Sequence, residues 1–219
     1  MIVYNPNDMS LKSEFFYSLK NAPNLSEIQL SRFNKIKIAS LSDFLKDELP
    51  SVTNLSLSGS SFNNPDIIME DLKGIELFKG LKNLTINYNN KILDISAIKN
   101  CPTLEKVILT YCNINSLKGI EELTNLKILN INNNNITALK PIENLKNLTE
   151  LNLQNNAISD TSSYIDTDGS TKTYRNLDIL ANLNSSRNGK LTSLYLSGND
   201  NIIDFSPVSS LNWSNKSGF

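Results

Sequence analysis

Apolar residues recur along the chain at spacings that alternate between two and three. The repeated pattern is L-x-x-L-x-L-x-x-N-x-I, and it begins at Leu104, Leu126 and Leu148, at intervals of 22 residues. Apolar residues two apart predict a short strand with one buried face. Since a single unit of this kind cannot bury its apolar face alone, the units are expected to stack into an array.

Further copies of the unit extend the array in both directions. Copies begin at Leu81 and Leu191, each with one extra residue after the Asn position, and a weaker copy begins at Val52. The second half of each unit also repeats, with apolar residues three apart that are expected to close the core behind the strands. These residues are Leu72, Ile75 and Phe78; Ile95, Ile98 and Cys101; Leu117, Ile120 and Leu123; Leu139, Ile142 and Leu145; and Phe205, Val208 and Leu211.

The Asn that follows each strand is expected to point inward. Its amide carries donors and an acceptor, so it can satisfy backbone groups of the turn that lack partners in the sheet. Cys112 takes this position in one unit, and Cys101 aligns with core leucines of other units. Both cysteines are therefore expected to be buried free thiols rather than nucleophiles.

With these residues aligned, the unit resembles the internalin-like class of bacterial leucine-rich repeats over about residues 52–213. The segments Asp94-Ile95-Ser96, Leu139-Lys140-Pro141-Ile142 and Asp204-Phe205-Ser206-Pro207 carry the resemblance. It implies a leucine-rich-repeat solenoid, or horseshoe, with a parallel concave β-sheet and a convex side of mostly 3₁₀ and irregular turns. It also implies a binding protein at the bacterial surface or secreted from the cell. The cytoplasm is the alternative, because residues 1–7 lack the features of a secretory leader.

The chain is expected to divide into three parts. Residues 1–32 form a helical N-terminal cap, residues 33–213 hold about seven repeats with an insert at 159–190, and residues 214–219 form a tail. The cap contains a helix from Asp8 or Ser10 to about Lys20 and a second short helix from Ser26 to Arg32.

Two registers are open for the start of the array. In the preferred one, the cap is followed by a first strand that holds Ile36 and Ile38, since a terminal unit needs a distinct shape to cover the open end of the core. The rival register places a repeat at Leu25, Ile28 and Leu30.

The insert at 159–190 lengthens one unit by about 21 residues. The segment from Tyr164 to Thr171 predicts a hairpin with Asp168-Gly169 as a two-residue turn. The segment from Tyr174 to Leu183 predicts a short helix. The insert is either a binding element or a bulge on the convex side, since inserted loops cost little free energy.

Composition narrows the chemistry available to the chain. It has 219 residues, no His and a net charge of −1. The charge does not favour nucleic acid or anionic membranes, and the lack of His removes the commonest general base and metal ligand. Asp166 and Asp168 before Gly169 suggest a calcium loop, but EF-hand spacing needs acids at Tyr164 and Arg175. No enzymatic activity, cofactor, metal site, membrane insertion or nucleic-acid partner is expected.

The residues between the buried strand positions should form one concave surface that is polar and almost uncharged. Its central column is expected to run Lys37, Ser56, Thr85, Ile108, Asn130, Asn152 and Tyr195. Tyrosine anchors among adaptable amides are typical of protein-recognition surfaces. The candidate ligand-binding residues are Thr85, Asn87, Tyr88, Ile108, Thr110, Tyr111, Ile128, Asn130, Asn132, Asn152, Gln154 and Tyr195.

The expected partner is a protein, such as a host receptor, bound by a monomer of this chain. Asn, Gln and Tyr also suit the hydroxyl groups of carbohydrates, so a glycan or the cell wall is the alternative ligand. A third hypothesis makes the array the recognition part of a larger enzyme or effector, whose catalytic site lies in the insert or outside the chain.

Overall fold

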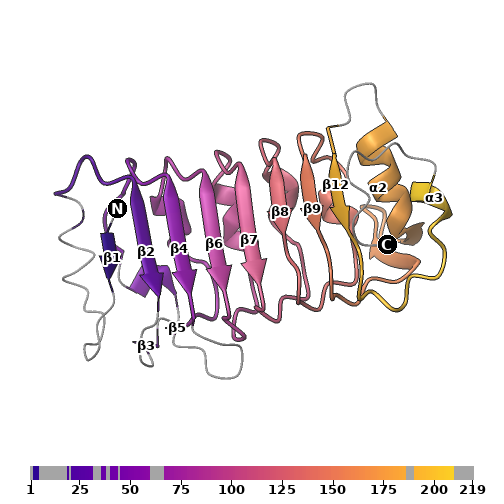
Figure 1. Ribbon diagram of the computed structural model, residues 1–219, viewed down its shortest axis with the longest axis horizontal. Helices are drawn as coiled ribbons and strands as arrows, with labels where there is room; N and C mark the ends of the chain where they lie inside the picture. The colour runs from indigo at the N-terminus through magenta and orange to yellow at the C-terminus, as the bar shows by residue number, and fades with distance from the viewer. Residues whose placement is uncertain are drawn as a thin grey trace.

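Eight parallel strands form the main sheet of the computed structural model, which describes residues 2–4, 19, 21–31, 36–37, 40–43, 45–59, 67–185 and 190–209 (Figure 1). Their order in the sheet follows their order in the chain, as the stacking of units predicts. The strands are β1 (Ile2–Tyr4), β2 (Glu27–Ser31), β4 (Asn54–Ser58), β6 (Asn83–Asn87), β7 (Lys106–Thr110), β8 (Ile128–Asn130), β9 (Glu150–Asn152) and β12 (Ser193–Tyr195).

Short turns of 3₁₀ helix line the opposite side of most units, which confirms the expected solenoid with a 3₁₀-rich convex side. These turns are η1 (Leu41–Asp43), η2 (Ile75–Leu77), η3 (Ser96–Asn100), η4 (Ile120–Glu122) and η5 (Lys140–Ile142). Towards the C-terminus, α2 (Asn176–Ser185) and α3 (Ser206–Ser209) take the corresponding places. A two-stranded parallel sheet of β3 (Ile36–Lys37) and β5 (Ile67–Ile68) lies apart from the main sheet.

The core lies between the sheet and these turns. In β6, Leu84 and Ile86 are fully buried, while the alternate residues are half-buried on the other face. Ile98 of η3 is also fully buried. Each unit therefore adds at least two strand residues and one turn residue to a continuous core, and full burial of each such side chain contributes about 1.5–3 kcal/mol.

Inward-pointing asparagines link successive units, as expected. Asn134 donates from Nδ2 to the carbonyl of Leu109 (2.7 Å) in the preceding unit and to that of Ile131 (2.9 Å) in its own. Its Oδ1 accepts from the backbone N–H groups of Cys112 (3.1 Å) and Ile114 (3.0 Å). One buried amide thus satisfies at least four backbone groups that the sheet leaves unpaired.

Cys112 replaces the asparagine in its unit and is buried, as is Cys101, so the prediction of two buried free thiols is confirmed. The Cys112 thiol lies 3.4 Å from the carbonyl of Ile86 and 3.2 Å from that of Thr110, and it takes over part of the donor role of an amide. Burial raises the pKa of Cys101 to about 11 and that of Cys112 to about 12. Both thiols therefore stay protonated near neutral pH.

The start of the array differs from the preferred expectation. The helix expected over Ser26–Arg32 is wrong, because residues Glu27–Ser31 form β2, which pairs with both β1 and β4. Ile28 and Leu30 are fully buried, so the rival register describes this segment. The buried and exposed residues of this segment alternate with a period of two, and the segment pairs with a strand on each edge. These two features favour a strand over the helical cap.

A second error concerns the segment that was expected to supply the first strand. Ile36 lies in β3 and pairs with Ile67 outside the main sheet. Ile38 and most of the helix expected from Asp8 or Ser10 to Lys20 lie outside the described residues, as does the tail at 214–219. Leu19 is described, and it is helical and buried. The division into cap, repeats and tail remains a prediction.

The hairpin expected in the insert is confirmed by the antiparallel pairing of β10 (Thr161–Ile165) with β11 (Thr171–Arg175). Its expected two-residue turn is wrong. The N–H of Asp166 donates to the carbonyl of Ser170 (2.8 Å), and that of Gly169 donates to the carbonyl of Asp166 (2.9 Å). Gly169 has a φ of +80°. This arrangement is a three-residue loop in which glycine takes the left-handed position of a bulge.

The helix expected in the insert is also confirmed, and it belongs to the core. In α2, Leu177, Leu180 and Leu183 are buried, and the helix packs between η5 and α3. Fully buried Asn176 joins the hairpin to the neighbouring unit, because its Oδ1 accepts from the N–H of Leu139 (2.9 Å) and its Nδ2 donates to the carbonyl of Ser159 (2.9 Å). The insert is thus an enlarged convex element that carries an ordered hairpin.

Candidate functional site

Rows of side chains cross the concave face, because the strands pair without a change of register. The first row is Glu27, Asn54, Asn83, Lys106, Ile128, Glu150 and Ser193. The second row is Gln29, Ser56, Thr85, Ile108, Asn130, Asn152 and Tyr195. The third row begins with Ser31, Ser58, Asn87 and Thr110. Period-two strands in register are what bring these residues together.

Most of the candidate residues predicted from the sequence lie on this face, with two qualifications. The predicted placement of Lys37 in the central column is wrong. Lys37 pairs with Ile68 in the small sheet, and Gln29 occupies the corresponding position of the column. Thr110 is only 9% exposed, because its hydroxyl donates to Oδ1 of Asn87 (2.6 Å) rather than facing solvent.

Sequence reasoning missed Glu27 and Gln29, which lie on β2 at the N-terminal end of the face. The pattern that could have found them was the rival register at Leu25, Ile28 and Leu30, since it places these two residues on the outward positions of a strand.

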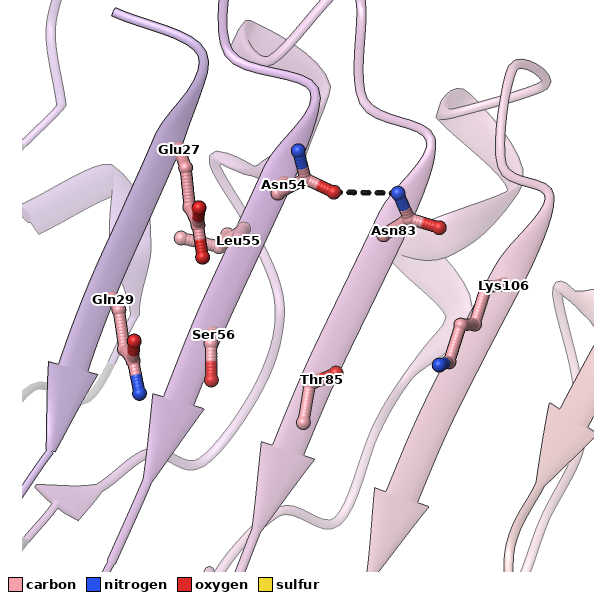
Figure 2. Close-up of a pocket in the computed structure, with 8 residues that line it drawn as sticks. All are labelled: Glu27, Gln29, Asn54, Leu55, Ser56, Asn83, Thr85 and Lys106. Atoms are coloured by element: carbon pink, nitrogen blue, oxygen red, sulfur yellow. Dashed lines mark hydrogen bonds between the residues drawn. The ribbon is translucent and has the colours of Figure 1, made fainter. Parts of the chain in front are cut away.

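A hollow of about 380 Å³ lies over the first four repeat strands of the face (Figure 2). We call it the concave hollow; it is lined by Glu27, Gln29, Asn54, Leu55, Ser56, Asn83, Thr85 and Lys106. Figure 2 shows the Asn83 amide bonded to Asn54, with Nδ2 of Asn83 2.5 Å from Oδ1 of Asn54. Nδ2 of Asn54 donates in turn to Oγ1 of Thr53 (2.9 Å). The amides therefore hold a fixed orientation for a ligand.

Charge on the concave face is sparse and alternates in sign along the first row. Glu27, Lys106 and Glu150 are its charged members, and within the described residues none of the three makes an ion pair. By contrast, Glu105 on the adjacent rim contacts Lys127, and their hydrogen bond lowers the pKa of the Glu105 carboxyl. The charges of the row are thus available to a partner.

Next to the concave hollow lies a patch of larger side chains, which we call the Ile–Tyr patch: Tyr88, Ile108, Tyr111 and Ile128. The isoleucines are diagonal neighbours on β7 and β8. The rings of Tyr88 and Tyr111 stack with centroids 4.9 Å apart and planes inclined by 21°. The stack follows the ends of β6 and β7, so the patch spans three successive units.

The two tyrosines occupy a position where the backbone is left-handed. Tyr88 has a φ of 55° and Tyr111 a φ of 56°, like Asn133 (55°), Asn155 (52°) and Gly198 (73°) at the same point of later units. Asn and Gly tolerate this conformation, whereas a bulky residue pays about 1 kcal/mol for it. Backbone strain of this kind is found most often at functional sites. The sequence alone shows the column but not its φ values.

The described residues contain no group of three His, Cys, Asp or Glu side chains placed to hold a metal ion. Asp168, considered for a calcium loop, accepts from the hydroxyl (2.5 Å) and N–H (2.8 Å) of Ser170, and these bonds lower its pKa. None of the helices in the described part of the chain has the length and apolar character that crossing a bilayer requires.

Comparison with known proteins agrees with this geometry. The family of leucine-rich repeats in two copies matches residues 124–166. No curated protein matches the sequence. Among solved structures, an internalin (inlF) from Listeria monocytogenes superposes with a TM-score of 0.65 at 25% identity, over 89% of this chain and 48% of its own. Internalin C2 from the same species gives a TM-score of 0.51 at 23% identity, over 83% and 76%.

A leucine-rich-repeat protein from Leptospira interrogans shares the fold, with a TM-score of 0.54 at 19% identity over 90% of this chain and 53% of its own. The chain spans about half the length of the internalin inlF structure. Repeat arrays of this fold typically mediate protein–protein interaction through an extended concave surface, and they are generally binding modules rather than enzymes.

Proposed function

We propose that this internalin-like leucine-rich-repeat chain is a non-catalytic module of a bacterial surface or secreted protein, and that it binds a protein partner through its concave face. The observation that carries the proposal is the Ile–Tyr patch, whose isoleucines lie in register beside the polar concave hollow and whose tyrosines stack just beyond the ends of β6 and β7. Apolar and aromatic anchors surrounded by polar groups are the usual composition of a binding hot spot.

The isoleucines supply the apolar part of the contact. Ile108 and Ile128 are half-buried on adjacent strands. At the position of Ile108 other units place Thr85, Asn130 or Asn152, and at that of Ile128 they place Asn83, Lys106 or Glu150. An apolar side chain of the partner that covers both would remove their remaining surface from water. Truncating a central contact of this kind costs a complex more than about 1 kcal/mol.

The charged row supplies orientation. With strands about 4.8 Å apart, three steps place Lys106 about 14 Å from Glu27, and two steps place it about 10 Å from Glu150. A partner surface that fits this row carries the opposite order of charges, positive, negative and positive. Complementary charges of this kind raise the association rate more than they strengthen the final complex.

The absence of catalysis is part of the proposal and follows from the chemistry of the concave hollow. Glu27 is its single carboxylate and Lys106 its single cation, and they lie on strands three steps apart. A general acid or base must lie within hydrogen-bond reach of the proton that it transfers, so two groups about 14 Å apart cannot act on the same substrate atoms. The amides that fill the space between them donate and accept hydrogen bonds but do not ionise near neutral pH.

The experiment is affinity capture from a host-cell surface-protein extract, followed by titration of the identified partner in purified form. We expect the double variant Ile108→Thr/Ile128→Thr to bind the purified partner at least about tenfold more weakly, since about 1.4 kcal/mol of contact free energy is lost. Thr keeps the β-branched shape, so the strands should persist.

The matched control is Leu93→Thr, which removes an exposed leucine (69% exposed) that lies outside the strands of the concave face. It should bind like the wild type. A captured partner whose affinity is the same for the double variant and the control, or no partner that survives purification, refutes the proposal.

A further inference from the structure

We infer that the chain has a second ligand site, which takes an acidic oligosaccharide, in a hollow of about 400 Å³ on the rim where the strands begin. We call it the lysine hollow, and it is lined by Lys82, Thr103, Glu105, Asn125, Lys127 and Asn147. It shares no residue with the concave hollow or the Ile–Tyr patch, and the inference does not depend on the proposed protein partner.

The charged part of the lining stands on a rigid edge of the sheet. Lys82, Glu105 and Lys127 directly precede β6, β7 and β8, so the repeat places them side by side. The carbonyl of Lys82 accepts from the N–H of Glu105 (2.8 Å), and the carbonyl of Glu105 accepts from that of Lys127 (2.8 Å). The three backbones are therefore fixed relative to one another before any ligand binds, which lowers the entropic cost of binding.

The neutral part of the lining forms a second column, two residues further from the strands. Its side chains donate to backbone carbonyls of the preceding unit: Thr103 to Leu81 (2.6 Å), Asn125 to Pro102 (3.0 Å) and Asn147 to Thr124 (2.8 Å). Among the described residues, Oδ1 of Asn125 accepts no hydrogen bond. This oriented oxygen is therefore available to a hydroxyl group of a ligand.

Positive charge is in excess at the lysine hollow. Nζ of Lys127 lies 2.5 Å from the Glu105 carboxylate, and Nζ of Lys82 lies 3.8 Å from it. The hydrogen bond with Lys127 lowers the pKa of the Glu105 carboxyl, which therefore stays ionised near neutral pH. A third ammonium group, that of Lys190, donates to Oδ1 of Asn147 (2.7 Å). Three cations around one carboxylate attract an acidic ligand.

These cations are accessible, and they recur along the rim. The side chains of Lys82 and Lys127 are each 56% exposed, and exposed ion pairs are weak enough for a ligand to compete with them. Lys82, Lys127 and Lys190 precede β6, β8 and β12, which are every second strand of the sheet. With strands about 4.8 Å apart, their backbones are about 10 Å apart. An oligosaccharide that lies along the rim can therefore pair with more than one cation at once.

The lining favours a carbohydrate over other polyanions. Nucleic-acid sites combine cations with aromatic side chains on which the bases stack, and the lining holds no aromatic residue. It also holds no aliphatic or aromatic residue against which the side chains of an acidic peptide could pack. Amide and hydroxyl groups match the hydroxyls of a sugar, and ammonium groups match its carboxylates or sulfates.

The test is calorimetric titration of the chain with four probes of equal length. They are an oligogalacturonide, which carries carboxylates, a heparin-derived oligosaccharide, which carries sulfates, a neutral malto-oligosaccharide and an oligoglutamate peptide. We expect at least one of the acidic sugars to bind, and the neutral sugar and the peptide to bind at least about tenfold more weakly. The preference between the first two identifies the acidic group.

Two variants should change the affinity for the acidic sugar in opposite directions. Lys82→Gln/Lys127→Gln should weaken binding at least about tenfold, because charge-assisted contacts are lost. Glu105→Gln should strengthen binding about threefold, because it removes the single carboxylate of the lining and keeps the size of the side chain. A gain of affinity is not the result that a merely structural role of Glu105 would give.

The matched control is Lys99→Gln/Lys118→Gln, which removes two exposed lysines outside the lysine hollow and changes the net charge by the same amount. It should bind the acidic sugar like the wild type. Equal losses in the two double variants would overturn the inference, because net charge alone would then explain them. No binding of either acidic sugar, equal binding of the peptide, or weaker binding by Glu105→Gln would also overturn it.

The variant Ile108→Thr/Ile128→Thr separates the two proposals, because it should lose the protein partner and keep the acidic sugar. Lys82→Gln/Lys127→Gln should do the reverse. Failure to capture a protein partner therefore counts against the proposed function and leaves the lysine hollow standing, whereas failure to bind the acidic sugars counts against the lysine hollow alone.

Discussion

Replacing Asn134 with Ala tests how much the inward asparagines contribute to the stability of the array. The side chain is 7% exposed and bonds to five backbone groups in two adjacent units. Ala cannot make any of these bonds. The N–H groups of Cys112 and Ile114 and the carbonyls of Leu109, Ile131 and Asn132 are then left without the amide.

The cost follows from the number of groups left unpaired. Each buried polar backbone group without a partner costs about 1–3 kcal/mol. Water that enters the space vacated by the amide recovers part of this cost. We therefore expect the free energy of unfolding to fall by about 2–5 kcal/mol. That is a large share of the 5–15 kcal/mol typical of a folded domain.

The assay is urea unfolding followed by circular dichroism, with two comparison variants. Asn134→Cys introduces the residue that the chain itself uses at position 112, where the thiol still donates to a carbonyl. It should fall between wild type and Ala. Asn135→Ala removes an exposed amide whose described bond is to Asn113, and it should cost within about 0.5 kcal/mol. A loss for Asn134→Ala as small as that of Asn135→Ala would refute the reasoning.

Two further predictions concern a glycine and the thiols. Gly119→Ala places a methyl group 2.7 Å from the carbonyl oxygen of Ser96, whereas Gly169→Ala, at a similar positive φ, meets nothing within 4 Å. Urea unfolding should show Gly119→Ala to be about 1–3 kcal/mol more destabilising, and equal costs would exclude the steric explanation. Cys101 and Cys112 should resist iodoacetamide at pH 8 until the chain unfolds, and fast native labelling would contradict this. Since burial raises both pKa values above 9.0, stability should decline as pH rises from about 9 towards 11.

Much of the fold could be predicted because the units from Leu81 to Ile158 repeat the same buried positions at nearly constant spacing. The N-terminal error has a physical cause. Ile28 and Leu30 give too short an alternation to distinguish a strand from the face of a helix, and pairing with β1 and β4 decides the matter. The sequence of a five-residue segment does not reveal long-range pairing of this kind.

The candidate site was predictable in part for the same reason. Register carries Ile108 and Ile128 onto one face, and that register follows from the repeat. The left-handed backbone at Tyr88 and Tyr111 depends on how the chain leaves each strand. Tyr is unfavourable in a left-handed conformation, so the presence of Tyr in the sequence would predict an ordinary backbone rather than the positive φ values observed. The site residues themselves remain a prediction until the binding variants are measured.

The strands keep one register although the path between them varies widely in length. Partner residues on adjacent strands from β2 to β12 are 27, 29, 23, 22, 22 and 43 positions apart in the chain. Natural or engineered insertions can therefore accumulate at the back of a unit while the concave face stays unchanged. The loop at Thr167–Gly169, at the tip of the hairpin, is accordingly a natural graft point. An epitope, a fluorescent reporter or a second binding peptide can be carried there without altering the register of the main sheet.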